Sequence, residues 1–182
     1  MCGIICTVNT TRFSRDSSNF LRDGIVTGAV RGQDSIGMLQ VDWKNAIYVH
    51  KKAVSGSAFL TNKIAEAFVT DAEKCRVTMV HHRAATMGKI SDDNAHPFVC
   101  DKLTVDPTSK KPHVLVGVHN GSLTNWKTKP GAKHYDVDSE WALNHIAQRG
   151  AEAFKDITGP YCFMWVDQTA PGKLFVTRNK DR

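Results

Sequence analysis

The chain has 182 residues, a length that suits one domain of ordinary size. Hydrophobic residues make up 41% and charged residues 23%, a balance typical of soluble globular proteins, and no apolar run approaches the roughly 20 residues that a membrane span needs. The formal charge of +6 comes from scattered lysines and arginines, whereas nucleic-acid-binding proteins usually show a concentrated basic patch. We therefore expect neither a membrane nor a nucleic acid among the partners.

The N-terminal residues and the cysteines indicate a reduced, cytoplasmic protein. The sequence MCGIICTVNTTR lacks the positively charged segment and the longer apolar run of a secretory signal. The five cysteines are an odd number without a CxxC pair, which argues against a disulfide framework or a zinc ribbon. Cys6, Cys75 and Cys162 lie in apolar runs and are expected in the core, whereas Cys100 lies near a polar turn.

The first half of the chain predicts strands and helices in turn. In chain order they are a strand over 3–8, a helix over 17–30, a hairpin with strands over 36–41 and 46–52, and a helix over 57–69. The first helix has Leu21 and Ile25 on one face, and Ser17 or Ser18 can serve as its N-cap. The segment RGQDSIG then breaks the helical pattern.

The second half predicts further strands around one long segment without periodicity. Strands are expected over 76–81 and 113–118, a helix over 138–148, and two closing strands over 160–166 and 173–178. Residues 83–112 lie between the first two of these strands, and a loop of that length in a compact domain is usually functional. Because strands dominate both ends of the chain and helices lie between them, the pattern favours an α+β layered domain over a parallel βαβ fold.

Cys2 differs from the other cysteines because removal of the initiator methionine would make it the N-terminal residue. It would then carry a thiol and a free α-amine, whose usual pKa of about 7.7–8 allows it to act as a base near neutral pH. Nucleophile and base in one residue are the arrangement of N-terminal-nucleophile enzymes. Considered alone, however, Cys2 is better explained as a buried cysteine that opens a strand.

Further polar residues suit a small amino-acid substrate. Asn120 and Gly121 follow an apolar strand and can supply two donors to an oxyanion, or they can form a tight turn. Arg83 can bind a carboxylate with its planar guanidinium, or it can form a surface salt bridge. Asp138 stands at a helix start, where an N-cap is the commoner role. A free α-amino acid needs one cation for its carboxylate and one anion for its ammonium, and Arg83 with Asp138 would supply that pair.

Four histidines, His81, His82, His96 and His119, raise the alternative of a metal site. Their spacings match neither HExxH nor a Cys/His finger. His81 and His82 are adjacent, so on a strand their side chains face opposite ways. We therefore expect no bound metal.

Six segments, taken in order, resemble the glutaminase domain of the class II glutamine amidotransferases. They are MCGI at the N-terminus, RGQDSIG at 31–37, the stretch from His81 to Gly88, NAHPF at 94–98, HNGSLTN at 119–125 and DSE at 138–140. The second and third segments are similar to the RGxDxxG loop and the H-x-R-x-x-T-x-G segment of that family. The tail resembles its closing strands, so the resemblance covers nearly the whole chain and identifies residues 1–182 as one glutaminase domain.

This resemblance implies a fold, a nucleophile and a reaction. The fold would be a four-layer αββα sandwich of the N-terminal-nucleophile hydrolase type. Cys2 would attack the side-chain amide of L-glutamine, release ammonia and form a glutamyl thioester that water hydrolyses to glutamate. Asn120 and Gly121 would form the oxyanion hole, and no cofactor is implied.

The resemblance also implies how the substrate is held. Arg83, with help from Thr86, would bind the carboxylate of glutamine, and Asp138 would bind its α-ammonium. Arg31 and Gly32 would shape the loop over the nucleophile.

The chain departs from the family at two positions and leaves the branch open. Ala84 stands where one subfamily has an aromatic residue, and Met87 replaces a histidine or another polar residue. RGQD and NGSLTN look closest to the phosphoribosyl-pyrophosphate amidotransferases, whereas HPF-type contexts also occur in the glucosamine-phosphate synthases.

The family couples ammonia release to a synthetase domain, and no such domain fits in 182 residues. We therefore expect the ammonia acceptor on a domain or subunit outside this chain. Two other hypotheses stay open: an N-terminal-nucleophile amidohydrolase that acts on another amide, and a non-catalytic relative that binds or regulates a partner. The Arg83–Asp138 pair argues against the first, and intact Cys2 argues against the second. A retained Met1 would block the α-amine and favour the second.

Overall fold

A computed structural model describes residues 2–102 and 113–179 of the chain. They fall into two compact units, the first formed by Met1–Ala85 and Lys89–Pro97 and the second by Thr86–Gly88 and Phe98–Arg182. Each unit contains one four-stranded sheet. No helix within the described ranges combines the length and the apolar character that crossing a lipid bilayer requires.

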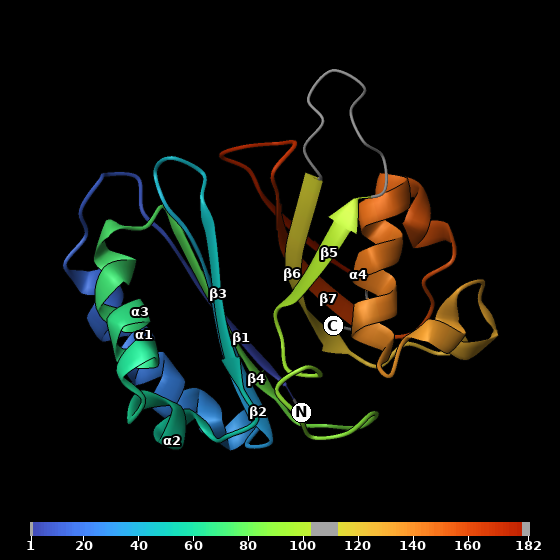
Figure 1. Cartoon of the computed structure of the whole chain (residues 1–182), viewed down its shortest axis with the longest axis horizontal. Coiled ribbons are helices and arrows are strands. Elements are labelled where there is room, and N and C mark those ends of the chain that lie inside the picture. Colours follow the sequence, from blue (N-terminus) through green and yellow to red (C-terminus); the bar gives the residue numbers. More distant parts are fainter. Residues whose placement is uncertain (1, 103–112, 180–182) are drawn as a thin grey trace. The chain divides into compact units, whose positions relative to one another are not determined.

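The sheet of the first unit has the strand order β1-β4-β2-β3, with all neighbours antiparallel (Figure 1). The strands are β1 (Gly3–Val8), β2 (Ser35–Val41), β3 (Ile47–Lys52) and β4 (Val77–Arg83). Gly3 pairs with His82, so the start of β1 lies beside the end of β4. Cys2, which precedes β1, is therefore brought to the end of the strand that carries Arg83.

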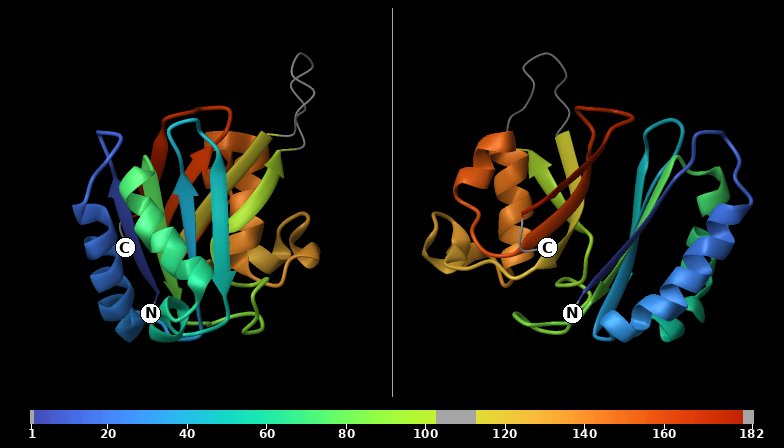
Figure 2. Two further views of the ribbon diagram at one scale, coloured as in Figure 1. Left: turned by 60° about the vertical axis from the view of Figure 1, so that its left-hand side comes forward. Right: turned by 180° about the vertical axis from the view of Figure 1, so that it is seen from behind.

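Helices cover one face of this sheet (Figure 2). They are α1 (Asp16–Gly28), which continues in the 3-10 turn η1 (Ala29–Arg31), then α2 (Gly56–Leu60), α3 (Lys63–Asp71) and η2 (Ala72–Lys74). Leu21 and Ile25, one turn apart on α1, are fully buried, as their spacing predicted. They pack in one cluster with Phe59 and Val69 from the other helices and Met38 from the sheet. Burial of this apolar face attaches the helices to the sheet.

The predicted N-cap of α1 is wrong. The helix begins at Asp16, and no side chain caps it. The hydroxyl of Ser17 donates to Asn9 at 2.6 Å, and the hydroxyl of Ser18 donates to Glu73 at 2.6 Å. Both serines are thus used in tertiary hydrogen bonds, which the local sequence could not reveal.

The helix predicted over 57–69 is two helices. Asn62 lies between them, and its side-chain oxygen accepts hydrogen bonds from the backbone N–H groups of Ile64 and Ala65. Asparagine in this geometry is a strong N-cap, so a new helix begins at this point. The apolar pattern continues across Asn62 without a break, which is why the sequence predicted a single helix.

The sheet of the second unit has the strand order β5-β6-β7-β8, again with all neighbours antiparallel. The strands are β5 (Phe98–Lys102), β6 (His113–Gly121), β7 (Tyr161–Asp167) and β8 (Leu174–Arg178). The helix α4 (Asp138–Arg149) covers one face of it (Figure 2), and the short turns η3 (Trp126–Thr128), η4 (Ala132–His134) and η5 (Gly150–Lys155) flank this helix in the sequence. Leu143 and Ile146 of α4 pack with Leu115 and Phe163 of the sheet in a buried cluster.

Strand β5 was not predicted, and it falls inside the stretch of 83–112 expected to lack regular structure. Phe98 and Cys100 are buried while Val99 is exposed, so buried and exposed side chains alternate along the strand as in other half-buried strands. The exposed position, however, carries an apolar residue. That exposed valine obscured the period of two. Residues 103–112 of the predicted loop lie outside the described residues.

The predicted α+β class is confirmed, since each of two antiparallel sheets is flanked by helices.

The cysteine predictions need correction. Cys75 is buried as expected, but Cys6 and Cys162 are only partly buried, and Cys100 is fully buried because it lies in β5. Burial raises the pKa of Cys6 to about 12.

Candidate active site

Cys2 is seated on the backbone that follows β4. The backbone N–H of Ala84 donates to the Sγ of Cys2 at 3.4 Å. The same Sγ lies 3.6 Å from the carbonyl oxygen of Ala84. Ala84 directly follows Arg83, so the thiol and the guanidinium-bearing residue occupy the same end of the sheet. The antiparallel pairing of β1 with β4 creates this proximity between residues that are 82 positions apart.

Arg31 and Gly32 lie against the same backbone. The Nε of Arg31 donates to the carbonyl oxygen of Cys2 at 3.1 Å. A Cβ atom on Gly32 would lie 2.5 Å from the carbonyl carbon of Arg83 and 2.7 Å from the nitrogen of Ala84, so only glycine fits this close approach. The structure thus brings together four of the predicted site residues: Cys2, Arg31, Gly32 and Arg83.

Asp34, a member of the RGQDSIG segment, was not predicted as a site residue. Its Oδ2 accepts a hydrogen bond from the N–H of Ala85 at 2.7 Å, and its own N–H donates to the carbonyl of Arg83 at 3.1 Å. These two bonds tie the loop after η1 to the end of β4. The sequence contains Asp34 within a recognisable motif, but it gives no indication that this carboxylate bonds to the backbone of Ala85.

Arg83 is a buried residue and not the surface residue that the salt-bridge interpretation assumed. Its side chain is only 4% exposed, and one of its terminal nitrogens donates to the carbonyl of Lys89 at 3.1 Å. The side chain of Asn94 donates to the same carbonyl at 3.2 Å. Arg83 and Asn94 therefore organise residues 89–94, which belong to the NAHPF-containing segment of the first unit.

Asn120 and Gly121 end β6 in the second unit, where they pair with Cys162 and Tyr161 of β7. The tight turn considered from the sequence is therefore absent at this position, because both residues are in the strand. A Cβ atom on Gly121 would lie 2.1 Å from the carbonyl oxygen of Pro160. Glycine is required here by the close approach of a neighbouring backbone.

Asp138 is the first residue of α4 and is 6% exposed. Its Oδ2 accepts from the N–H of Leu123 at 2.8 Å, and its Oδ1 accepts from the N–H of Ser139 at 2.9 Å. Val137 occupies the N-cap position, so the N-cap role predicted as commoner for Asp138 is wrong. Burial raises the pKa of Asp138, and the N–H donors only partly oppose that rise. A cation beside this carboxylate would offset the cost of burying its charge.

Thr86 is exposed and lies three residues beyond Arg83. It belongs to the short stretch Thr86–Gly88, which groups with the second unit, whereas Arg83 belongs to the first. Its assistance in carboxylate binding stays a prediction. Met87, one of the two departures from the family pattern, packs against the apolar cluster of the second unit.

Of the four candidate histidines, the three in the first unit do not share one side of β4. His81 and His82 face opposite sides of β4: the ring of His81 lies 3.9 Å from that of His96, whereas the ring of His82 lies beside Gly28 and Gly56. Over residues 2–102 and 113–179 no group of three or more His, Cys, Asp or Glu side chains is suited to hold a metal ion. Burial lowers the pKa of His82 to about 4, and the backbone of Gly32 opposes this shift only in part.

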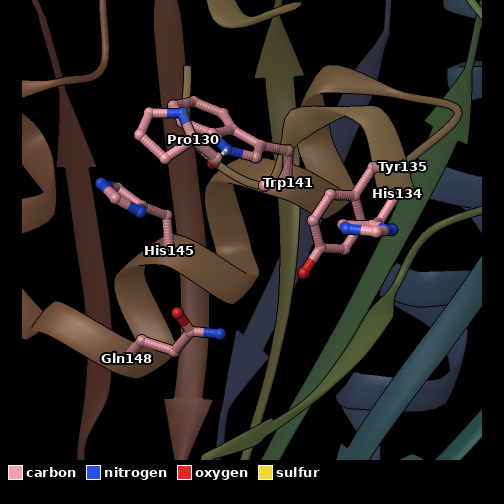
Figure 3. A pocket seen from close by; sticks show the side chains of 7 residues that line it. Pro130, His134, Tyr135, Trp141, His145 and Gln148 are labelled. Atoms are coloured by element: carbon pink, nitrogen blue, oxygen red, sulfur yellow. Dashed lines mark hydrogen bonds between the residues drawn. The ribbon is translucent and has the colours of Figure 1, made fainter.

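A cavity of about 220 Å³ lies in the second unit, beside α4 and η4 (Figure 3). Trp141 forms part of its wall and stacks on His145, with ring centroids 5.1 Å apart. The remaining lining residues are Pro130, Gly131, His134, Tyr135 and Gln148. No predicted site residue lines this cavity, so it is separate from the end of β6 that carries Asn120.

Comparison with models of protein families gives no match for this chain. Known proteins do match: the glutamine–fructose-6-phosphate aminotransferase (isomerizing) of Buchnera aphidicola subsp. Acyrthosiphon pisum is 29% identical over 197 aligned positions, which cover 98% of this chain. The enzymes of the same name from Streptococcus pneumoniae strains R6 and TIGR4 are 30% and 31% identical over 99% of this chain. The chain spans about 29% of the length of these relatives.

Solved structures share the fold. A glutamine phosphoribosylpyrophosphate amidotransferase from B. subtilis, in complex with ADP and GMP, superposes with a TM-score of 0.65 and 18% identity over 89% of this chain and 34% of that chain. A structure described as the allosteric regulatory enzyme of purine biosynthesis gives the same TM-score and identity over 92% of this chain and 35% of that chain. The two antiparallel sheets with their flanking helices are thus a known domain fold.

Proposed function

We propose that this chain, which belongs to the class II glutamine amidotransferase family as a glutaminase domain, hydrolyses L-glutamine to glutamate and ammonia with Cys2 as its nucleophile. The observation that carries the proposal is the seating of Cys2. Its sulfur meets the backbone of Ala84, and its carbonyl accepts a hydrogen bond from Arg31. A thiol held in this way beside the loop that carries Arg31 has a defined position from which to attack.

The reaction begins with the α-amine of Cys2, which is available once Met1 has been removed. This amine takes the thiol proton, and the sulfur attacks the side-chain carbonyl carbon of glutamine. The oxygen becomes negatively charged in the tetrahedral intermediate, where the amide of Asn120 and the N–H of Gly121 stabilise it. The C–N bond then breaks, the protonated amine returns its proton to the leaving group, and ammonia departs. Water hydrolyses the glutamyl thioester and releases glutamate.

Substrate selection rests on two opposite charges. The guanidinium of Arg83, with Thr86, binds the α-carboxylate, since a planar fork of donors matches a carboxylate. The carboxylate of Asp138 binds the α-ammonium, and its burial makes that ion pair stronger than one at the surface. Amides without an α-amino acid group lack both partners, and this argues against the alternative of an amidohydrolase for another amide.

The ammonia is consumed by an acceptor domain or subunit. The relatives are more than three times as long as this chain, and their name describes an aminotransferase of glutamine and fructose 6-phosphate. A synthetase domain or a separate synthetase subunit is therefore the partner that we propose. That synthetase partner, and not this chain, would determine which molecule accepts the ammonia.

The core proposal is tested by the mass of the purified chain and by ammonia release from glutamine. Wild type without Met1 is expected to release ammonia and Cys2→Ala to release none. Cys6→Ala, which removes another partly buried cysteine, is the matched control and is expected to behave as wild type. Equal release by wild type and Cys2→Ala would overturn the proposal. A folded chain that retains Met1 and is inactive would favour the non-catalytic alternative.

A further inference from the structure

His119 precedes the proposed oxyanion residues and lies on the other side of β6 from the first of them. It is 1% exposed, and its ring stacks on that of Phe163, its partner on β7, with centroids 4.4 Å apart and an angle of 17° between the planes. Because successive side chains of a strand face opposite ways, His119 faces α4 and Asn120 faces away from that helix.

The ring of His119 packs directly on Gly121. A Cβ atom on Gly121 would lie 2.5 Å from the Nε2 of His119, so the imidazole fills the space that a side chain would take. The next residue, Ser122, donates its N–H to the carbonyl of Pro160 at 3.1 Å. The Cβ side of Gly121 is therefore covered both by the His119 ring and by the carbonyl of Pro160, which also fixes the following residue.

A chain of hydrogen bonds runs from this ring to the N-terminus of α4. The Nδ1 of His119 lies 2.8 Å from the Oγ of Ser139, and the hydroxyl of Ser139 donates to the Oδ1 of Asp138 at 3.4 Å. A serine hydroxyl has a single proton, so its donation to Asp138 requires that the Nδ1–H of His119 donate to the same oxygen. The other oxygen of Asp138 accepts from the N–H of Leu123, which returns the chain to the segment that follows β6.

We propose that His119 and Ser139 are positioning residues that couple the carboxylate of Asp138 to the backbone of the oxyanion pair. This inference rests on the proposed function, in which Asp138 binds the α-ammonium and Asn120 with Gly121 holds the oxyanion. The coupling means that the group recognising the amino acid and the groups stabilising the transition state are connected through three hydrogen bonds and the packing of the His119 ring on Gly121. It holds the end of β6 in the geometry that catalysis needs, and such positioning acts on kcat more than on KM.

Two substitutions break the same hydrogen bond from opposite ends. His119→Phe keeps a ring over Gly121 and against Phe163 but removes the Nδ1–H donor. Ser139→Ala removes the hydroxyl. Each is expected to lower kcat for glutamine about tenfold with little change in KM, the effect of losing one buried hydrogen bond. The double variant is expected to be no slower than the slower single variant, because both changes remove one interaction.

Ser139→Thr keeps a hydroxyl and is expected to restore most of kcat. Asn144→Ala is the matched control on the same helix, since its side chain bonds only within α4, to the carbonyl of Glu140. Thermal unfolding of every variant identifies any that fail to fold. Unchanged kcat in both single variants, or losses that multiply in the double variant, would overturn the coupling.

A second measurement separates this inference from the function on which it rests. The ¹⁵N NMR signals of the His119 ring are expected to show a protonated Nδ1 in wild type and a shift of that signal in Ser139→Ala. An unprotonated Nδ1 would overturn the hydrogen-bond chain even if glutamine is hydrolysed. Absence of ammonia release from wild type would overturn the proposed function, and the catalytic coupling with it, whatever the tautomer.

Discussion

The carboxylate of Asp34 accepts a hydrogen bond from the backbone N–H of Ala85 at 2.7 Å, and the neighbouring N–H of Ala84 donates to the sulfur of Cys2. Asp34 follows the Arg31–Gly32 pair by only a few residues, so one short loop contacts Cys2 through Arg31 and, through Asp34, the backbone beside the residue that holds the sulfur. The position of the thiol therefore depends on a residue that never touches it.

Loss of the Asp34 side chain should disorganise the nucleophile. Asp34→Ala leaves the N–H of Ala85 without its acceptor, which is expected to lower the free energy of unfolding by about 1–2 kcal/mol and kcat by about tenfold. Asp34→Asn retains an oxygen acceptor and should recover most of both. Asp93→Ala, at an exposed position, is the control. Steady-state kinetics and chemical denaturation measure the effects, and an Asp34→Ala enzyme with normal kcat would contradict this role.

A glutamine analogue that alkylates thiols should label Cys2 selectively. Burial raises the pKa of Cys75 to about 11 and that of Cys6 to about 12, so both stay protonated and unreactive near neutral pH. The rate of labelling at Cys2 should fall as the pH drops below the usual α-amine pKa of about 7.7–8, because the protonated amine cannot act as a base. Peptide mass mapping over a pH series measures this. Labelling at Cys75 or Cys100 in place of Cys2 would count against the assignment.

Asp138→Asn should weaken glutamine binding. The substitution removes the negative charge that would pair with the α-ammonium, and we expect KM to rise about tenfold or more. Asp136→Asn, at an exposed position two residues away, should leave KM unchanged. Initial rates over a range of glutamine concentrations separate KM from kcat. An unaltered KM in Asp138→Asn would show that another group binds the ammonium.

His82 should make the first unit less stable in mild acid. Its pKa is lowered from 6.5 to about 4 in the folded protein because the ring is buried, so the unfolded chain binds more protons between these values. Its contribution to stability is therefore complete above pH 6.5 and is lost as the pH falls towards 4, by roughly 3 kcal/mol in total. Urea unfolding at a series of pH values measures the slope.

The control for that slope is a comparison of two histidine variants. His82→Asn removes the buried imidazole and should flatten the dependence on pH between 6.5 and 4. His134→Asn, at an exposed position, should leave the dependence as in wild type. Equal slopes for the two variants would contradict the assignment to His82.

Much of the secondary structure was predictable because it follows from local periodicity. The spacing of Leu21 and Ile25 predicted the buried face of α1. The predicted bounds of the strands near the two ends of the chain agree with the observed bounds to within a few residues. The errors arose where a tertiary contact or an unusual side chain overrode the pattern. Ser17 bonds to Asn9 and does not cap its helix, and exposed Val99 concealed the alternation of β5.

The sequence by itself determined the α+β class, the family resemblance and the identity of the residues proposed for catalysis, because these follow from residue types, their order and their spacing. Only the tertiary structure decided how those residues are supported. Ala84 contacts the sulfur of Cys2 across 82 positions of the chain, and Ser139 meets His119 across 20 positions. Such contacts depend on strand register and on how a helix packs against its sheet, and neither is encoded in any short stretch of sequence.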